Sequence, residues 1–226
     1  FRKASEQKSK MNKSLHRRKF IKTSAITAAG LSLFHPLTSF ASNKKSSGKR
    51  IGIIGLDTSH ATAFVEALNG PNPDAAYDGY TITAAYPQGS KVIKSSYERI
   101  PKYTEEVKKF GVEIVNSIEE LLKKTDVIML ETNDGNPHLA QALQVMKAGK
   151  TLWIDKPIAA SLADVLSIYD AAKKYNVPVF SASSLRYATN VQETASGQSA
   201  GKIIGADTYS PCPIDSTHPD FFWYGI

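Results

Sequence analysis

The chain has 226 residues, of which 42% are hydrophobic and 22% are charged, as in an ordinary soluble globular protein. Its formal net charge of +7 arises in residues 1–50, which hold 13 lysines and arginines and a single acidic residue, Glu6. Residues 51–226 hold 15 basic and 20 acidic residues, so the body of the chain lacks the basic surface that nucleic-acid binding requires.

The first part of the chain is predicted to be an export signal. A basic run at residues 16–22 (HRRKFIK) precedes an apolar stretch at residues 23–40 and small residues up to Ala41, which is the arrangement of a signal peptide. Arg17 and Arg18, followed by Phe-Ile-Lys, resemble the twin-arginine signal. An ordinary secretory signal is the alternative. The apolar stretch is too polar to span a membrane, so we expect no membrane span after signal removal.

These features divide the chain into four predicted segments. We expect translation to start at Met11, residues 1–41 to form the leader and signal peptide, and residues 42–49 to form a flexible polar linker. A folded domain is expected over residues 50–182, followed by the truncated start of a second, α+β substrate domain over residues 183–226. The mature protein is expected to be exported to the periplasm.

From residue 50 onward, short apolar runs alternate with amphipathic stretches, and this pattern predicts strands alternating with helices. Ser117 and Ser161 each stand where a helix N-cap is expected. The predicted strands are residues 50–56, 80–86, 112–115, 126–130, 151–154 and 177–180, and the predicted helices cover residues 61–68, 101–110, 138–148 and 161–175, with one more starting at residue 117. This order predicts an α/β fold, a Rossmann-type doubly wound parallel sheet that binds ligands beyond the carboxyl ends of its strands.

The turn after the first predicted strand matches only part of the dinucleotide-binding fingerprint Gly-x-Gly-x-x-Gly. Gly55 supplies the first glycine, whereas Asp57 stands in place of the second. A carboxylate there would repel a pyrophosphate unless it turned away to cap the following helix. Thr58, Ser59 and the amides at the helix start remain able to donate hydrogen bonds to an oxyanion.

The loop after the second predicted strand is also unusual for a dinucleotide site. Residues 86–90 (YPQGS) lack the acidic residue that commonly holds the ribose hydroxyls of NAD. Lys91 lies just beyond and is placed to meet the 2′-phosphate of NADP. NADP is therefore slightly favoured over NAD as cofactor, and a loop that only turns the chain is the alternative.

The most specific pattern in the chain is the run at residues 148–159 (AGKTLWIDKPIA). An Ala-Gly-Lys segment, a short strand and then an acidic residue followed by Lys-Pro resembles the Gfo/Idh/MocA oxidoreductases, which include glucose–fructose oxidoreductase and inositol dehydrogenase. The family has Glu where this chain has Asp155. His138 matches the histidine that opens the preceding helix in the family.

This resemblance implies hydride transfer between NAD or NADP and a carbon of a sugar or polyol. It implies Lys156 as the catalytic group, hydrogen-bonded to the reacting oxygen and stabilising its developing negative charge. Asp155 would then position the loop, and Pro157 would stiffen it. We expect a small carbohydrate-like substrate, and a homo-oligomer for the full-length protein.

Ten residues are expected to contact the cofactor. A packing role is an equal alternative for His60, and a structural polar contact is favoured over catalysis for His138. No group of residues has metal-ligand spacing, so no metal is expected. The ten residues are Gly55, Asp57, Thr58, Ser59, His60, Thr132, Asn133, His138, Asp155 and Lys156.

The end of the chain is expected to lie inside the second domain. Residues 203–209 are predicted to form a strand of that domain, and residues 223–226 match the part of a family motif that precedes its catalytic histidine. The chain is therefore expected to be a fragment that is inactive by itself. Two alternatives stay open for the whole protein, namely a non-catalytic ligand-binding protein with a degenerate nucleotide site and a redox-neutral, NAD-dependent glycoside-cleaving enzyme.

Overall fold

The computed structural model describes residues 48–197, 201–207 and 209. All of them lie in one of the two compact units of the chain, Lys45–Ile226. The predicted signal peptide and the final predicted motif at residues 223–226 lie outside the described residues. Within the described part, no helix has the length and apolar character needed to cross a membrane.

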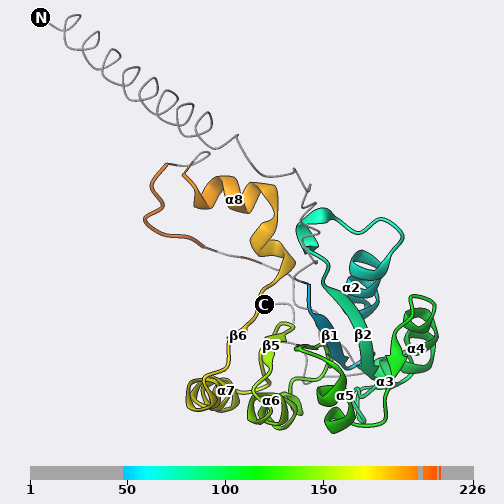
Figure 1. Ribbon diagram of the computed structural model, residues 1–226. Helices are drawn as coiled ribbons and strands as arrows, with labels where there is room; N and C mark the ends of the chain where they lie inside the picture. Colours follow the sequence, from blue (N-terminus) through cyan, green and yellow to red (C-terminus); the bar gives the residue numbers. More distant parts are fainter. Residues whose placement is uncertain (1–47, 198–200, 208, 210–226) are drawn as a thin grey trace, which may run out of the picture. The chain divides into compact units, whose positions relative to one another are not determined.

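A six-stranded sheet forms the centre of this unit, and all its strands are parallel (Figure 1). The strand order is β3-β2-β1-β4-β5-β6, which is the order of a dinucleotide-binding sheet, and it confirms the predicted Rossmann-type fold. From β1, the chain adds β2 and β3 toward one edge of the sheet, and it then returns to the centre and adds β4, β5 and β6 toward the other edge. The strands are β1 Arg50–Ile54, β2 Thr81–Tyr86, β3 Glu113–Ile114, β4 Val127–Leu130, β5 Thr151–Ile154 and β6 Val179–Phe180.

Helices cover both faces of the sheet, and the central strands β1, β2, β4 and β5 place apolar side chains in two separate clusters of buried residues, one on each face. One cluster joins the sheet to α5 Ile118–Lys124, α6 His138–Lys147 and α7 Leu162–Tyr175. The other joins it to α2 Ser59–Asn69 and α4 Ile100–Lys108. This arrangement confirms the predicted two-sided cover (Figure 1).

Short polar side chains fix where the helices begin. Ser117 accepts a hydrogen bond from the backbone N–H of Glu120 at 3.1 Å, and Ser161 accepts one from Asp164 at 3.1 Å. Both are the N-cap bonds that the sequence predicts. The carboxylate of Glu120 bonds the backbone N–H of Asn116 at 3.1 Å, one residue before the N-cap.

Four short helices were not predicted, and one predicted strand is not formed. The additional helices are η1 Ala75–Tyr77, α3 Lys94–Tyr97, η2 Ser184–Tyr187 and α8 Thr189–Ala195. The prediction of a strand at residues 203–209 is wrong for the residues described there, 203–207 and 209, which are in no strand. Ile204 and Tyr209 are 97% and 95% exposed, so their backbone has no neighbouring strand in the described part to pair with.

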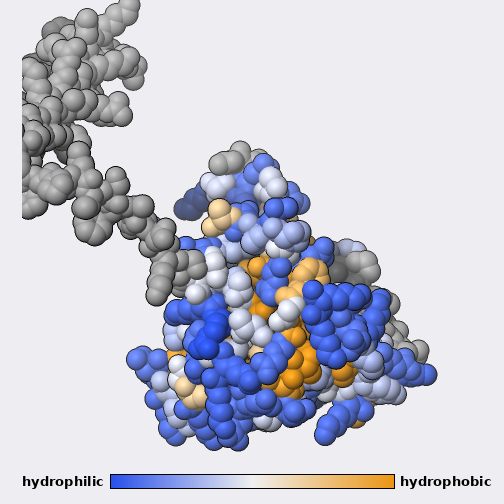
Figure 2. Space-filling view, turned by 45° about the vertical axis from the view of Figure 1, so that its right-hand side comes forward, coloured by the Kyte–Doolittle hydropathy of each residue, from blue (hydrophilic) through white to orange (hydrophobic). Residues whose placement is uncertain are grey.

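The surface of the unit is largely hydrophilic, with one interruption. Figure 2 shows hydrophobic side chains gathered in a patch near the middle of the face in view, between areas of hydrophilic side chains. Several acidic residues are instead buried near the carboxyl edge of the sheet, namely Asp57, Glu131, Asp134 and Asp155.

Candidate functional site at the carboxyl edge of the sheet

The register of the three central strands places three residues side by side at the carboxyl edge. Ile54 pairs with Leu130, and Leu130 pairs with Ile154. The backbone ladder continues one residue further, because the N–H of Glu131 donates to the carbonyl of Ile54 at 2.8 Å and that of Asp155 donates to the carbonyl of Leu130 at 2.9 Å. Gly55, Glu131 and Asp155 therefore directly follow β1, β4 and β5 in one row.

Strand alternation directs the side chains of this row toward α2. The residue two places before Glu131 is Met129, which belongs to the cluster under α2 and α4. The residue two places before Asp155 is Trp153, whose ring packs edge-on against Phe64 of α2 at 5.2 Å between centroids. Because side chains two apart on a strand share a face, the carboxyl groups of Glu131 and Asp155 lie on the face where α2 begins.

The turn after β1 requires glycine. Gly55 has a φ of +98°, and a Cβ at this position would lie 2.4 Å from the backbone nitrogen of Thr132. The turn is thus packed directly against the end of β4. Thr58 then caps α2 by accepting a hydrogen bond from the N–H of Ala61 at 3.4 Å, and Ser59 is exposed at the first position of the helix.

The carboxylate of Asp57 is turned away from the start of α2 and does not cap this helix. Its carboxylate is fully buried and accepts hydrogen bonds from the backbone N–H groups of Ser90 at 3.0 Å and Asn133 at 3.1 Å. Burial raises the pKa of Asp57, and these two bonds oppose the rise. Asp57 therefore joins the loop after β2 to the loop after β4.

The loop after β4 is held by bonds within the protein. Thr132 is 2% exposed, and its hydroxyl accepts a hydrogen bond from Gln141 at 3.0 Å. The side-chain amide of Asn133 donates to the hydroxyl of Ser96 at 2.8 Å. Both residues lie at the carboxyl edge as predicted, with these side-chain groups engaged by other parts of the chain.

His138 connects the loops that follow β4 and β5. Its two ring nitrogens lie 2.7 Å from the carbonyl oxygen of Thr132 and 2.9 Å from that of Ile158. The side chain is buried, which agrees with a structural polar contact at the start of α6.

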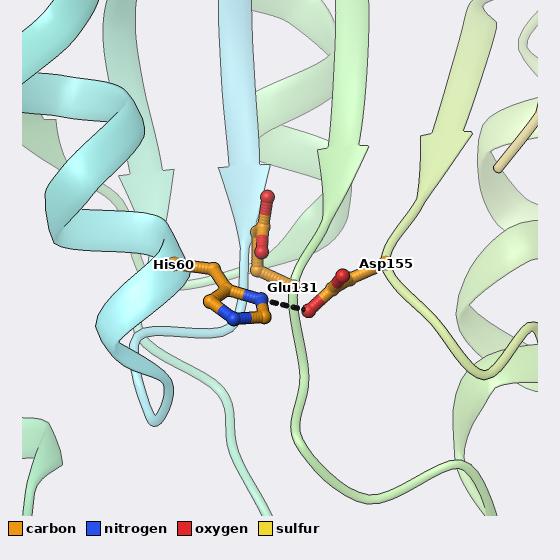
Figure 3. A group of neighbouring side chains, drawn as sticks. All are labelled: His60, Glu131 and Asp155. Carbon is orange, nitrogen blue, oxygen red and sulfur yellow. Dashed lines mark hydrogen bonds and ion pairs between the residues drawn. The ribbon is translucent and has the colours of Figure 1, made fainter. Parts of the chain in front are cut away.

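The centre of the site is a group of three side chains, from α2 and from the residues that directly follow β4 and β5, namely His60, Glu131 and Asp155 (Figure 3). Nδ1 of His60 lies 2.6 Å from Oδ2 of Asp155. The other carboxylate oxygen of Asp155 accepts from the backbone N–H of Lys156 at 2.8 Å. One ligand-type atom from each of the three side chains lies within 4.8 Å of the others.

Of the three groups, the carboxylate charge of Glu131 is the least well stabilised. It is fully buried, and neither carboxylate oxygen has a hydrogen-bond partner. Burial raises the pKa of Glu131 well above its ordinary value, and the nearby carboxylates of Asp155 and Asp57 raise it further. A proton or a cation is needed to neutralise this group.

The other half of the carboxyl edge, at the end of β2, is an open hollow of about 430 Å³. Its lining residues include no acidic side chain, and Lys91 is its one charged lining residue in the described part of the chain. In a sheet of this order, the end of β2 is where the adenosine half of a dinucleotide lies. The hollow is lined by Tyr86, Pro87, Gln88, Gly89, Ser90, Lys91, Tyr97 and Ile100.

The structure brings most of the predicted cofactor residues to one edge, within the first turn of α2 and the loops after β4 and β5. Sequence reasoning missed Glu131, Ser90 and Gln141, which link or line these loops. The alternation of β4 could have indicated Glu131, because it continues the face that Met129 starts. Its partners His60 and Asp155 are distant in the sequence, so metal-ligand spacing was not recognisable.

Comparison with known proteins identifies the family. Residues 49–183 match the model of the oxidoreductase family with an NAD-binding Rossmann fold, Gfo/Idh/MocA. The match covers more than half of the chain, and the chain belongs to this family. No curated protein matches the sequence.

Solved structures share the fold at low sequence identity. The WlbA dehydrogenase of Chromobacterium violaceum, in complex with NADH and UDP-GlcNAcA, has a TM-score of 0.53 and 19% identity over 74% of this chain and 42% of its own. The UDP-N-acetylglucosamine 3-dehydrogenase GnnA of Acidithiobacillus ferrooxidans gives 0.51 and 15% over 66% and 43%. KijD10, a 3-ketoreductase from Actinomadura kijaniata in complex with TDP-benzene and NADP, gives 0.50 and 18% over 66% and 43%. The chain thus spans less than half the length of each.

Proposed function

Starting from membership of this family, we propose that the full-length protein is an NAD(P)-dependent oxidoreductase that transfers hydride to or from a carbon of a sugar or polyol. The observation that carries the proposal is the position of Asp155-Lys156-Pro157. The segment follows β5 at the carboxyl edge of the sheet, in the same row as the end of β1 and the end of β4. Solved relatives named for nucleotide sugars support a carbohydrate substrate.

The residues at this edge suit a dinucleotide in two respects. The hollow at the end of β2 offers room for an adenosine, and the tight turn at Gly55 leads into the free amides at the start of α2, which favour a phosphate group. Asp57 does not oppose the phosphate directly, because its carboxylate is turned inward onto two backbone amides. The buried charge of Glu131 and Asp155 must be neutralised before a diphosphate can approach them closely.

Lys156 is the proposed catalytic residue. When bound, the nicotinamide supplies the hydride donor or acceptor. A lysine ammonium at the substrate oxygen would hydrogen-bond that oxygen and stabilise the negative charge that develops on it. Asp155 would hold the lysine-bearing loop, because its carboxylate accepts a hydrogen bond from the backbone N–H of Lys156.

Two experiments on the full-length protein test this function. Absorbance and mass spectrometry of the purified protein should show bound nicotinamide cofactor, or added NAD(P) should raise the melting temperature. Lys156→Ala should abolish turnover with the fold intact, whereas Lys147→Ala, a change at an exposed lysine on α6, should leave turnover unchanged. Absence of both bound cofactor and a thermal shift, or normal turnover by Lys156→Ala, would contradict the proposal.

A non-catalytic ligand-binding protein is the second candidate, and Asp57 is the observation that favours it. The position that most dinucleotide sites give to glycine is here a buried carboxylate. Failure to bind NAD(P) would favour this candidate. If cofactor is bound but the bulk NAD(P) keeps its redox state during turnover, the enzyme instead cleaves its substrate without net oxidation.

We further propose that the protein is exported through the twin-arginine route, on the basis of Arg17 and Arg18 in the basic run at residues 16–22. Replacement of both arginines by lysine should retain the protein in the cytoplasm. Cell fractionation of the wild type and the double variant provides the measurement. Unchanged export of the variant would contradict this route and would favour an ordinary secretory signal.

A further inference from the structure

Glu131 is a buried carboxyl group beside two other carboxyl groups. Both oxygens are buried without a hydrogen-bond partner, although most buried polar groups in proteins have one. Asp155 and Asp57, which are themselves carboxylates, lie close enough to raise the pKa of Glu131 further. The folded chain therefore concentrates negative charge at a place where desolvation makes it costly.

The side chains around Glu131 have the composition of a metal site. Figure 3 shows the imidazole of His60 and the carboxylate of Asp155 facing each other beside the carboxylate of Glu131. The three potential ligand atoms, one nitrogen and two oxygens, lie within 4.8 Å of one another. We propose that His60, Glu131 and Asp155 bind a divalent transition-metal ion at the ends of β4 and β5.

The charges and ligand types favour this class of ion. Two carboxylates carry a combined charge of −2, which a divalent cation balances. An imidazole nitrogen suits zinc, iron, cobalt or nickel, whereas magnesium and calcium prefer oxygen ligands. Three protein ligands leave at least one coordination position for water or substrate, as in catalytic zinc sites.

The distance between His60 and Asp155 must increase for an ion to bind between them. Ligand atoms around a tetrahedral metal lie roughly 3.3–3.5 Å apart when the bonds are about 2.0–2.2 Å. Nδ1 of His60 and Oδ2 of Asp155 are closer, at 2.6 Å, and share a hydrogen bond. The His60 side chain is 45% exposed at the start of α2, so its ring has room to move away as the ion replaces the proton.

Because the two carboxylates are buried, an ion reaches the proposed site from the side of His60. The side chain of Asp155 is 6% exposed and Glu131 is fully buried, whereas His60 reaches the surface. This inference goes beyond the proposed oxidoreductase function and does not rest on nicotinamide binding.

Metal titration of the full-length protein tests the proposal. After treatment with a chelator, the protein is titrated with ZnCl₂ by calorimetry, and with MgCl₂ as the comparison ion. We expect one zinc equivalent bound, a rise in melting temperature and no comparable binding of magnesium. CoCl₂ in place of zinc should give the visible absorption of cobalt in a nitrogen and oxygen site.

Three variants locate the ion. His60→Ala and Glu131→Gln should each weaken zinc binding by roughly 10-fold to 100-fold or more, and should remove the cobalt absorption. Glu66→Gln, a change at an exposed glutamate on the same helix as His60, should leave both unchanged. If Glu131→Gln does not fold, His60→Ala decides alone, because its side chain is partly exposed at a helix start.

Two results would overturn the proposal. One is zinc binding of equal strength in the wild type and His60→Ala, which would place the ion on other histidines of the chain. The other is the absence of zinc binding by a folded, cofactor-free wild type, which would mean that a proton neutralises Glu131. Both results leave the nicotinamide test untouched, so failure of the metal site and failure of the oxidoreductase function are distinguishable.

Discussion

The two halves of the carboxyl edge differ in charge and in exposure to solvent. The end of β2 is an open hollow whose lining carries no acidic side chain, and backbone and uncharged groups dominate it. The ends of β4 and β5 hold buried carboxylates next to a histidine, and one carboxyl group has no hydrogen-bond partner. The first half offers volume for an organic ligand, whereas the second offers charge for a cation. This contrast underlies the proposals of a nucleotide at the first half and of a cation at the second.

Asp57 is the structural link between the two halves. It accepts hydrogen bonds from Ser90, in the loop that borders the hollow, and from Asn133, two residues after Glu131. Ser90 also donates through its hydroxyl to Asp134 at 2.9 Å. The residue that weakens the nucleotide fingerprint is therefore the one that holds both loops in place.

The largest effect is expected from breaking that link. Asp57→Ala leaves two buried backbone N–H groups without acceptors, which should lower the free energy of unfolding by about 2–4 kcal/mol. Asp57→Asn keeps one acceptor oxygen and should lose less. Urea denaturation of the full-length protein measures both variants, and an alanine variant as stable as the wild type would show that Asp57 does not hold the loops.

The next effect should have the opposite sign. Glu131→Met replaces an unpartnered buried carboxyl group with an apolar side chain of similar length, and should raise the stability of the metal-free protein by about 1–3 kcal/mol. The exposed control Glu66→Met should change stability little. Destabilisation by Glu131→Met would mean that the carboxyl group makes favourable contacts in the metal-free protein.

Removal of the positive charge of Lys91 should have a smaller effect, on cofactor binding in the hollow. Lys91 is its charged lining residue in the described part of the chain, and we expect it to pair with the 2′-phosphate of NADP at an exposed position. Lys91→Ala should therefore weaken NADP binding by about threefold to fivefold and leave NAD binding unchanged. Dissociation constants for both cofactors provide the test, with Lys94→Ala as the matched control. Equal losses for NAD and NADP would contradict this role.

The smallest effect should come from the opposite edge of the sheet. Asp126 precedes β4 and accepts hydrogen bonds from the side chain and backbone of Arg50, which lower its pKa to about 2. Since the folded pKa lies below the unfolded one, this stabilisation is present above about pH 4 and is lost as the pH falls toward 2. Asp126→Asn should slightly reduce the pH dependence of stability in that range. An unchanged profile would show that solvent screens the pair completely.

The sequence predicted the sheet well because its signals are local. Most strands are rich in apolar residues, as in β4 (VIML), and residues such as Ser117 and Ser161 mark helix starts within four residues. The predicted strand at residues 203–209 was wrong because a strand depends on a partner elsewhere in the chain. Its apolar composition alone could not supply that partner.

The site was harder to predict because its contacts join distant segments. Thr132 and Asn133 were correctly placed near the edge, but their bonds to Gln141, Asp57 and Ser96 depend on how three loops meet. Glu131 was overlooked because a glutamate after a strand usually starts a solvated loop. Only the strand register reveals that it ends in a buried row beside Asp155.

The division of the carboxyl edge into a nucleotide half and a cation half can be tested with a crystal structure of the full-length protein grown with zinc and NADP. Anomalous scattering recorded at the zinc edge would locate the metal ion. We expect one anomalous peak among His60, Glu131 and Asp155, and adenosine density in the hollow at the end of β2. A structure with NADP bound, but with no anomalous peak at these three side chains and the adenosine outside the hollow, would contradict the division of the carboxyl edge into a nucleotide half and a cation half.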